Sequence, residues 1–164
     1  MRSPRALLAL AALAGCGPRT PQVPGPEATS TGTTLVTMER GPCYGTCPVY
    51  RVSLGGDGVV TFVGTRFVSK VGADTSRVAP DQVGRLVDSL EASGYFALAD
   101  QYVPDSAACG RYATDAPTVT TSVQSNGQSK TVRHDHGCVG APPALAAMER
   151  LIDSVAGTSR WTGR

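Results

Sequence analysis

Residues 118–134, TVTTSVQSNGQSKTVRH, decide the fold, because two alternating runs flank Asn126-Gly127. Asn-Gly between such runs is the strongest short-range signal for a β-hairpin with a two-residue turn. With these two residues as the loop, Val119 falls opposite His134. The register places His134 on the mainly apolar side near the sheet end, where a backbone carbonyl is a commoner partner for a histidine than a metal ion.

Upstream of this hairpin, the spacing of apolar residues predicts further short strands. Residues 35–38, 49–54 and 59–63 are apolar or alternate between apolar and polar, and residues 65–70 extend the same pattern. The glycine-rich segment 55–58 connects the second and third of these strands and is read as a turn. The first half of the domain is therefore expected to be an antiparallel meander.

Two amphipathic helices are expected, one after each group of strands. Pro80 suits a first helical position, and Gly94 suits a left-handed stop. Pro142 and Pro143 open the second helix, which Gly157 closes. The apolar positions at helical spacing are Val83, Leu86, Val87 and Leu90 in the first helix, and Leu145, Met148, Leu151, Ile152 and Val155 in the second. The expected fold class is α+β, an antiparallel sheet with both helices packed on one face.

The N-terminal sequence gives the clearest indication of where in the cell the protein is located. Arg2 and Arg5 precede a short apolar run that ends in Leu13-Ala14-Gly15-Cys16, which looks like a bacterial lipobox. We expect residues 1–15 to be a signal peptide and Cys16 to carry a diacylglycerol, with palmitate among its acyl chains. The alternative is an ordinary signal peptide that leaves Cys16 as a free thiol.

The rest of the chain divides into a tether, a domain and a tail. Residues 16–33 are rich in Pro, Thr and Gly, a composition that cannot bury enough apolar surface to fold. Residues 34–157 are expected to form one domain, and residues 158–164 a flexible tail. Removal of residues 1–15 leaves 13 of the 15 basic residues against 13 acidic ones, so no nucleic-acid partner is expected.

Four cysteines remain once Cys16 is set aside, and an exported protein is expected to pair them. Of the three possible connectivities, we favour Cys43 with Cys47 and Cys109 with Cys138. The first pair would close a tight loop, and the second would join the segments on either side of the Asn-Gly hairpin. A crossed pattern would require the first strand connection to meet a distant one.

A second interpretation assigns two of these cysteines a redox or metal-binding role. Cys43 and Cys47 could be a thiol redox pair, or a Cu(I) site completed by His134 or His136. His134 and His136 would share one face of a strand, but a two-histidine site would still need a further ligand. The spacing of the cysteines alone is a weak signal, and we expect no metal and no cofactor beyond the lipid on Cys16. A third interpretation is a partner-binding or inhibitory loop with Tyr44 at its tip.

Residues 43–50, CYGTCPVY, resemble the motif Cys-x-Gly-x-Cys-Pro-x-Tyr of an uncharacterised bacterial domain of unknown function. The later Gly-Asp-Gly hairpin, the DAPT run at 115–118 and the closing helix are also similar to that family. The resemblance covers about residues 34–157. It implies domain limits and an envelope context, and no activity.

Enzyme motifs are missing from the sequence. It has no Gly-x-Ser-x-Gly elbow, His-Glu-x-x-His pair, phosphate-binding loop or dinucleotide fingerprint, and Asp115 and Asp135 would form an acid pair only by tertiary accident. We therefore expect a non-enzymatic binding or scaffold domain of the cell envelope. Its expected place is the outer membrane, held by the lipid anchor and facing the periplasm or the surface, with an envelope protein as a candidate partner.

Overall fold

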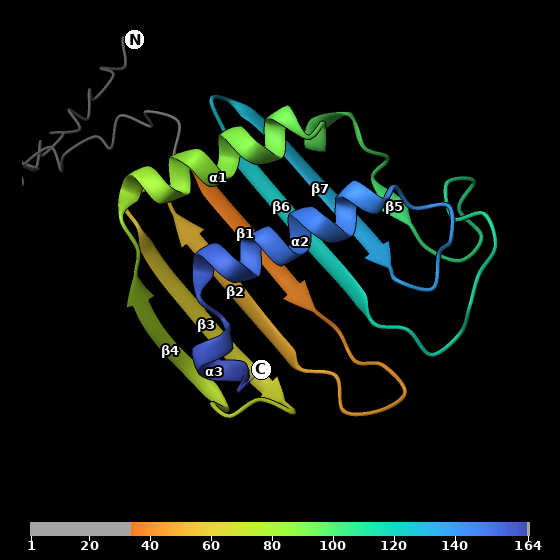
Figure 1. Ribbon diagram of the computed structural model, residues 1–164, viewed down its shortest axis with the longest axis horizontal. Coiled ribbons are helices and arrows are strands. Elements are labelled where there is room, and N and C mark those ends of the chain that lie inside the picture. The colour runs from red at the N-terminus through yellow and green to blue at the C-terminus, as the bar shows by residue number, and fades with distance from the viewer. Residues whose placement is uncertain (1–33, 164) are drawn as a thin grey trace, which may run out of the picture.

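The computed structural model describes residues 34–163, which form a seven-stranded sheet in the order β4-β3-β2-β1-β6-β7-β5 (Figure 1). The expected signal peptide, the lipidation site Cys16 and the tether lie outside the described residues. The strands are β1 (Leu35–Arg40), β2 (Val49–Gly55), β3 (Val59–Arg66), β4 (Gly72–Arg77), β5 (Gln101–Tyr102), β6 (Thr118–Ser125) and β7 (Gln128–Asp135). The helices are α1 (Pro80–Ala92), the 3-10 turn η1 (Tyr95–Ala97), α2 (Pro143–Ala156) and α3 (Ser159–Thr162).

The expected α+β architecture is confirmed. All strand pairs are antiparallel except β5 with β7, and α1 and α2 run side by side across one face of the sheet (Figure 1). No helix among residues 34–163 is long and apolar enough to cross a membrane.

The Asn-Gly hairpin has the predicted register. Ser125 pairs with Gln128 across Asn126-Gly127, and Val119 pairs with His134 at the far end. Asn126 and Gly127 have φ values of 50° and 78°, the positive values that a type I′ turn requires. Local turn chemistry therefore sets the alignment of the two strands.

The prediction of a strand over residues 65–70 is wrong. β3 continues to Arg66, and the next strand, β4, begins only at Gly72. The chain turns between them with Phe67 at a φ of 53°. A Cβ atom on Gly64 would lie 2.1 Å from the carbonyl oxygen of Lys70, so the turn packs directly against β3 at a glycine.

The core lies between the sheet and the two long helices. Helix α1 buries the four residues that its spacing predicts: Val83, Leu86, Val87 and Leu90. The connection after it turns at Gly94, whose φ is 85°. Helix α2 buries Leu145, Met148, Glu149, Ile152 and Ala156, whereas Leu151 and Val155 are half-buried beside α1. One charged residue therefore lies on the apolar stripe of α2.

Within the flexible tail expected over residues 158–164, the described residues 158–163 form a short capped helix instead. After Gly157 the chain turns into α3, which places Trp161 against the sheet with 4% of its surface exposed. The Trp161 ring stacks on Phe62 with centroids 4.7 Å apart, and its Nε1 donates to Asp74 at 2.9 Å. A single tryptophan gives no periodic signal in the sequence. The predicted domain boundary at residue 157 therefore falls before α3.

Candidate functional site

The candidate site begins with a row of paired residues near one end of the sheet. Tyr50 of β2 pairs with Arg40 of β1, Arg40 pairs with Val119 of β6, and Val119 pairs with His134 of β7. Directly paired residues point to the same face. Three polar side chains therefore lie in one row on the face that the helices cover.

Helix α2 lies above this row and supplies two carboxylates. Glu149 and Asp153 are four residues apart, so they lie on the same side of the helix. The Glu149 side chain is 1% exposed, whereas that of Asp153 is 22% exposed. Both carboxylates contact side chains of the sheet, so a polar cluster lies within the helix–sheet interface.

Glu149 bridges the two histidines. Its Oε1 lies 2.7 Å from His134 Nδ1, and its Oε2 lies 2.7 Å from His136 Nε2. The imidazole rings stack with centroids 4.3 Å apart. Burial alone would raise the pKa of Glu149, but the hydrogen bonds and charges of the two histidines lower it below its ordinary value.

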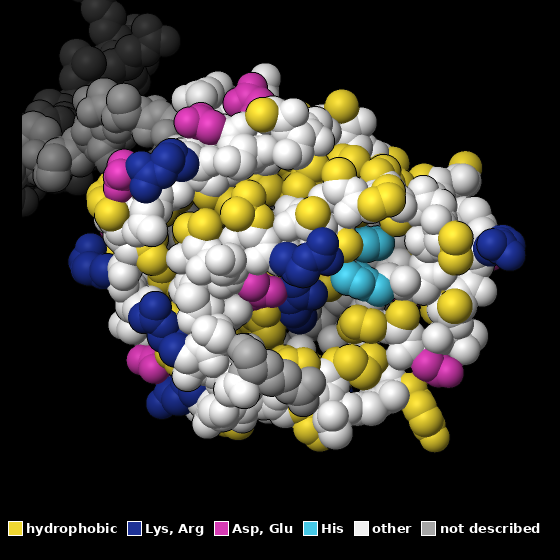
Figure 2. Space-filling view, viewed as in Figure 1, with side chains coloured by type: hydrophobic (Ala, Val, Ile, Leu, Met, Phe, Trp, Pro, Cys, Tyr) yellow, Lys and Arg dark blue, Asp and Glu magenta, His cyan; other side chains and the backbone are white. Residues whose placement is uncertain are grey.

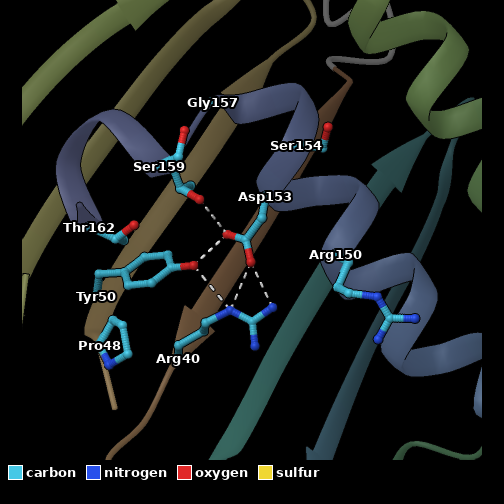
Figure 3. Close-up of a pocket in the computed structure, with 10 residues that line it drawn as sticks. Arg40, Pro48, Tyr50, Arg150, Asp153, Ser154, Gly157, Ser159 and Thr162 are labelled. Atoms are coloured by element: carbon cyan, nitrogen blue, oxygen red, sulfur yellow. Dashed lines mark hydrogen bonds and ion pairs between the residues drawn. The ribbon is translucent and has the colours of Figure 1, made fainter. Parts of the chain in front are cut away.

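Asp153 holds a second set of partners. Its Oδ2 accepts from Arg40 Nε at 2.9 Å and from Nη2 at 2.7 Å, while Oδ1 accepts from the Tyr50 hydroxyl and, at 2.8 Å, from Thr158 (Figure 3). Burial acts to lower the pKa of Arg40, but the Asp153 carboxylate raises it above its ordinary value. Burial and the same carboxylate raise the pKa of Tyr50, so this hydroxyl stays protonated.

The two sets are linked through Arg40, whose Nη1 lies 4.0 Å from Glu149 Oε2. The Arg40 side chain is 18% exposed and is the cation that the two carboxylates share.

An open pocket of about 540 Å³ lies beside this cluster, between α2, α3 and the ends of β1 and β2. Figure 3 shows that Arg40, Tyr50 and Asp153 form its inner wall. Arg150 lines it from the next turn of α2 and has no ion-pair partner among residues 34–163. The remaining lining residues are Pro48, Ser154, Gly157, Thr158, Ser159 and Thr162.

The sequence over residues 34–156 matches the family described as a domain of unknown function, DUF6438. The chain belongs to this family. No curated protein matches the sequence. Family membership gives the limits of the domain. The match ends with the last residue of α2, Ala156, and α3 follows it in this chain.

In this DUF6438 domain the four described cysteines form two local bridges. Cys43 is bonded to Cys47, and Cys109 is bonded to Cys138. This is the connectivity that the sequence favours over a crossed pattern. Tyr44 lies between the first pair with 87% of its surface exposed, as the interpretation of a protruding loop requires.

The histidines of the DUF6438 domain have a different partner from either expectation. His134 and His136 share a face, as alternation predicts, but their partner is Glu149 and not a backbone carbonyl. The Cu(I) ligand set of Cys43, Cys47 and a histidine is not assembled, because the cysteines are bonded to each other. Among residues 34–163, the only group of three metal-ligating side chains is His134, His136 and Glu149.

Sequence reasoning misses Arg40, Glu149 and Asp153. Glu149 had a detectable signal, because it lies four residues after Leu145 and three before Ile152, on the apolar stripe of its helix. The Asp135 carboxylate accepts the Gly137 N–H at 2.8 Å, whereas the Asp115 carboxylate accepts from the Thr114 hydroxyl at 3.0 Å. Arg40 and Asp153 had no such signal, since each contacts residues far away in the sequence.

Proposed function

We propose that this protein is a lipid-anchored domain of the bacterial cell envelope that acts by binding and not by catalysis. The lipobox Leu13-Ala14-Gly15-Cys16 supports the anchor, and Gly17 after it favours the outer membrane. Two acyl chains or more on Cys16 would hold the protein firmly, since each buried methylene contributes roughly 0.8 kcal/mol. The domain would face the periplasm or the surface, with an envelope protein as a candidate partner.

The two disulfides are consistent with this location. Cys43–Cys47 and Cys109–Cys138 both lie in connections outside the strands and long helices. Such bridges persist in oxidising compartments and are rare in the cytosol. They support an exported domain.

The observation that carries the binding role is the pocket beside Asp153. Its volume of about 540 Å³ falls within the usual range of ligand sites. Arg40 is already neutralised by Asp153, whereas Arg150 offers a guanidinium without an ion-pair partner among the described residues. With the hydroxyls of Ser154 and Ser159 nearby, the chemistry fits a small polar ligand that carries an anionic group.

The anchor is tested by mass spectrometry of the protein extracted from the membranes of a bacterial host. We expect a chain that begins at Cys16 and carries the mass of a diacylglycerol. Cys16→Ser should leave the precursor unprocessed. A soluble mature protein with a free thiol at Cys16 would overturn the anchor.

The pocket is tested by NMR titration with inorganic phosphate and with acetate as probe anions. Shift changes should centre on the residues that line the pocket, and Arg150→Ser should abolish them. The control is Arg133→Ser, because Arg133 is exposed on β7 and points to the opposite face from His134. Equal responses in the two variants would contradict the proposed pocket.

The alternative is thiol redox or copper handling through Cys43 and Cys47, and the exposed loop around Tyr44 favours access to that bridge. Counting thiols by mass spectrometry under graded reductant, with a Cu(I) titration, separates the two functions. Both bridges should resist mild reductant if they are structural. Selective opening of Cys43–Cys47 with stoichiometric copper uptake would support the alternative.

A further inference from the structure

The negative charge of Glu149 is buried, and the proposed anion pocket does not explain what compensates it. A carboxylate that is 1% exposed is costly to bury unless cations compensate it. Glu149 and Asp153 bring two negative charges, and Arg40 brings one positive charge within 4.0 Å of both. The histidines contribute charge only when they are protonated.

The donor atoms around Glu149 are those of a transition-metal site. One nitrogen from His134, one from His136 and a carboxylate oxygen all lie within 4.8 Å of one another. Imidazole nitrogen and carboxylate oxygen are common ligands of Zn²⁺, and two histidines with one glutamate form a recurrent zinc set. Ligand atoms about 2.0 to 2.2 Å from a tetrahedral ion lie roughly 3.3 to 3.6 Å apart, so modest side-chain shifts would admit one.

The backbone holds the two histidines in place. His134 lies in β7 opposite Val119, and the His136 N–H donates to the Pro117 carbonyl at 3.0 Å. Two residues later, Cys138 is bonded to Cys109. The segment that carries both imidazoles is therefore fixed on both sides, as a preorganised site requires.

The surroundings of the three ligands fit a site with one free position. His134 and Glu149 are buried, whereas the His136 side chain is 30% exposed. In Figure 2 histidine side chains are visible next to basic side chains on the face that α2 crosses, and His136 is the more exposed of the two. Structural zinc sites are closed by four protein ligands, whereas sites with three keep a position for water or a ligand. Arg40 would lie outside the ligand set, close to the Glu149 carboxylate.

We propose that His134, His136 and Glu149 bind a divalent transition metal ion of the zinc class, with one coordination position open to solvent. This site shares no ligand residue with the anion pocket, although Arg40 lines that pocket and lies 4.0 Å from Glu149. It does not depend on the lipid anchor. The metal ion would then compensate the buried Glu149 carboxylate. The ion would also join α2 to the end of β7.

The test uses the mature protein, exported so that both disulfides close, purified in detergent without a histidine tag and stripped with a chelator. Titration calorimetry with Zn²⁺ and the visible spectrum of the Co²⁺ form report binding and coordination number. We expect one ion per chain, a four-coordinate Co²⁺ spectrum and a rise in melting temperature with Zn²⁺.

Two variants locate the site. His136→Ala removes the most exposed ligand, and Glu149→Gln keeps the size of the side chain without its charge. Each should weaken Zn²⁺ binding by about 100-fold or more, since changes even outside the ligand set typically cost about 10- to 100-fold. Glu91→Gln is the matched control, because Glu91 is exposed on α1, and it should bind as the wild type does.

Melting curves without metal establish that each variant is folded before its affinity is compared. The proposal is overturned if the wild type takes up neither Zn²⁺ nor Co²⁺ stoichiometrically. It is equally overturned if folded His136→Ala and Glu149→Gln bind Zn²⁺ as tightly as the wild type. The anion titration of Arg150→Ser tests the pocket and the Zn²⁺ titration tests the metal site. A negative result in one experiment therefore does not decide the other.

Discussion

Glu149 and Asp153 lie one turn apart on α2, and both contact the sheet through its inward-facing polar residues. Glu149 meets two histidines of the β7 end, whereas Asp153 meets Arg40, Tyr50 and Thr158. The helix is thus held at two points by charged groups and elsewhere by its apolar stripe. The polar contacts fix the position of α2 along the sheet, because apolar packing alone has little directional preference.

Loss of the Asp153 carboxylate should destabilise the domain strongly. Asp153→Ala leaves Arg40 with only the more distant Glu149 carboxylate, at 4.0 Å, and removes the carboxylate that accepts from the Tyr50 hydroxyl. We expect a loss of roughly 2 to 3 kcal/mol, less than for a fully buried pair because both side chains are partly exposed. Urea denaturation measures it. Asp81→Ala, which removes an exposed pair with Arg85, should change the midpoint little, and an equal change would contradict this interpretation.

The two disulfides should contribute unequally to stability. The Cys109–Cys138 bridge spans 29 residues and Cys43–Cys47 spans four. Loop-closure entropy gives roughly 3 to 4 kcal/mol for the longer loop and about 2 kcal/mol for the shorter. Urea midpoints of the two double Cys→Ser variants should follow that order. The reverse order would mean that chain entropy does not govern these bridges.

Buried tyrosines should make the domain sensitive to alkali. Burial raises the pKa of Tyr95 to about 12, and its hydroxyl donates to Thr121 Oγ1 at 2.8 Å. In the unfolded chain a tyrosine titrates near about 10, so above that pH the unfolded state loses a proton that the folded state keeps. The free energy of unfolding should therefore fall as pH rises through this range.

Urea midpoints at about pH 9 and about pH 11 test this, since the two values bracket the ordinary tyrosine pKa. Tyr95→Phe should lower stability at the first pH and show a smaller further decline at the second. Tyr44→Phe, which changes a ring that is 87% exposed, should decline as the wild type does. An unchanged decline in Tyr95→Phe would exclude Tyr95 as a cause.

Two glycines should respond to alanine in opposite directions. A Cβ atom on Gly137 would lie 1.9 Å from the Ala113 carbonyl oxygen, so Gly137→Ala should cost about 2 kcal/mol or more. Gly84 lies inside α1 with no atom within 4 Å of its Cβ position. Gly84→Ala should stabilise by roughly 0.5 to 1 kcal/mol. Melting temperatures should shift in opposite directions, and a Gly137→Ala variant as stable as the wild type would refute the steric explanation.

The ordered C-terminus predicts that Trp161 is part of the folding unit. Trp161→Ala removes the stack on Phe62 and the hydrogen bond to Asp74, and should cost about 3 kcal/mol or more. Because the chain has one tryptophan, its fluorescence in the wild type should shift to the red in the same urea transition that circular dichroism detects. A separate, earlier fluorescence change would show that α3 unfolds independently.

Local chemistry in the sequence was enough to predict much of the fold. Asn126-Gly127 fixes the hairpin register, and the apolar spacing after Pro80 gives the buried face of α1. These features depend on neighbours within a few residues, where backbone preferences and periodicity act directly. The prediction of a strand over residues 65–70 was wrong because the turn depends on the close approach of Gly64 and Lys70. The spacing of apolar residues does not encode that contact.

The candidate site was likewise predictable in part from the sequence. The sequence by itself determined that His134 and His136 share one face of a strand end, because side chains alternate along a strand. Only the tertiary structure decided that Glu149 joins them and that Arg40 meets Asp153, 113 residues away. Those contacts depend on how α2 packs across the sheet, which is set by the combined packing of the whole core and leaves no local pattern in the chain.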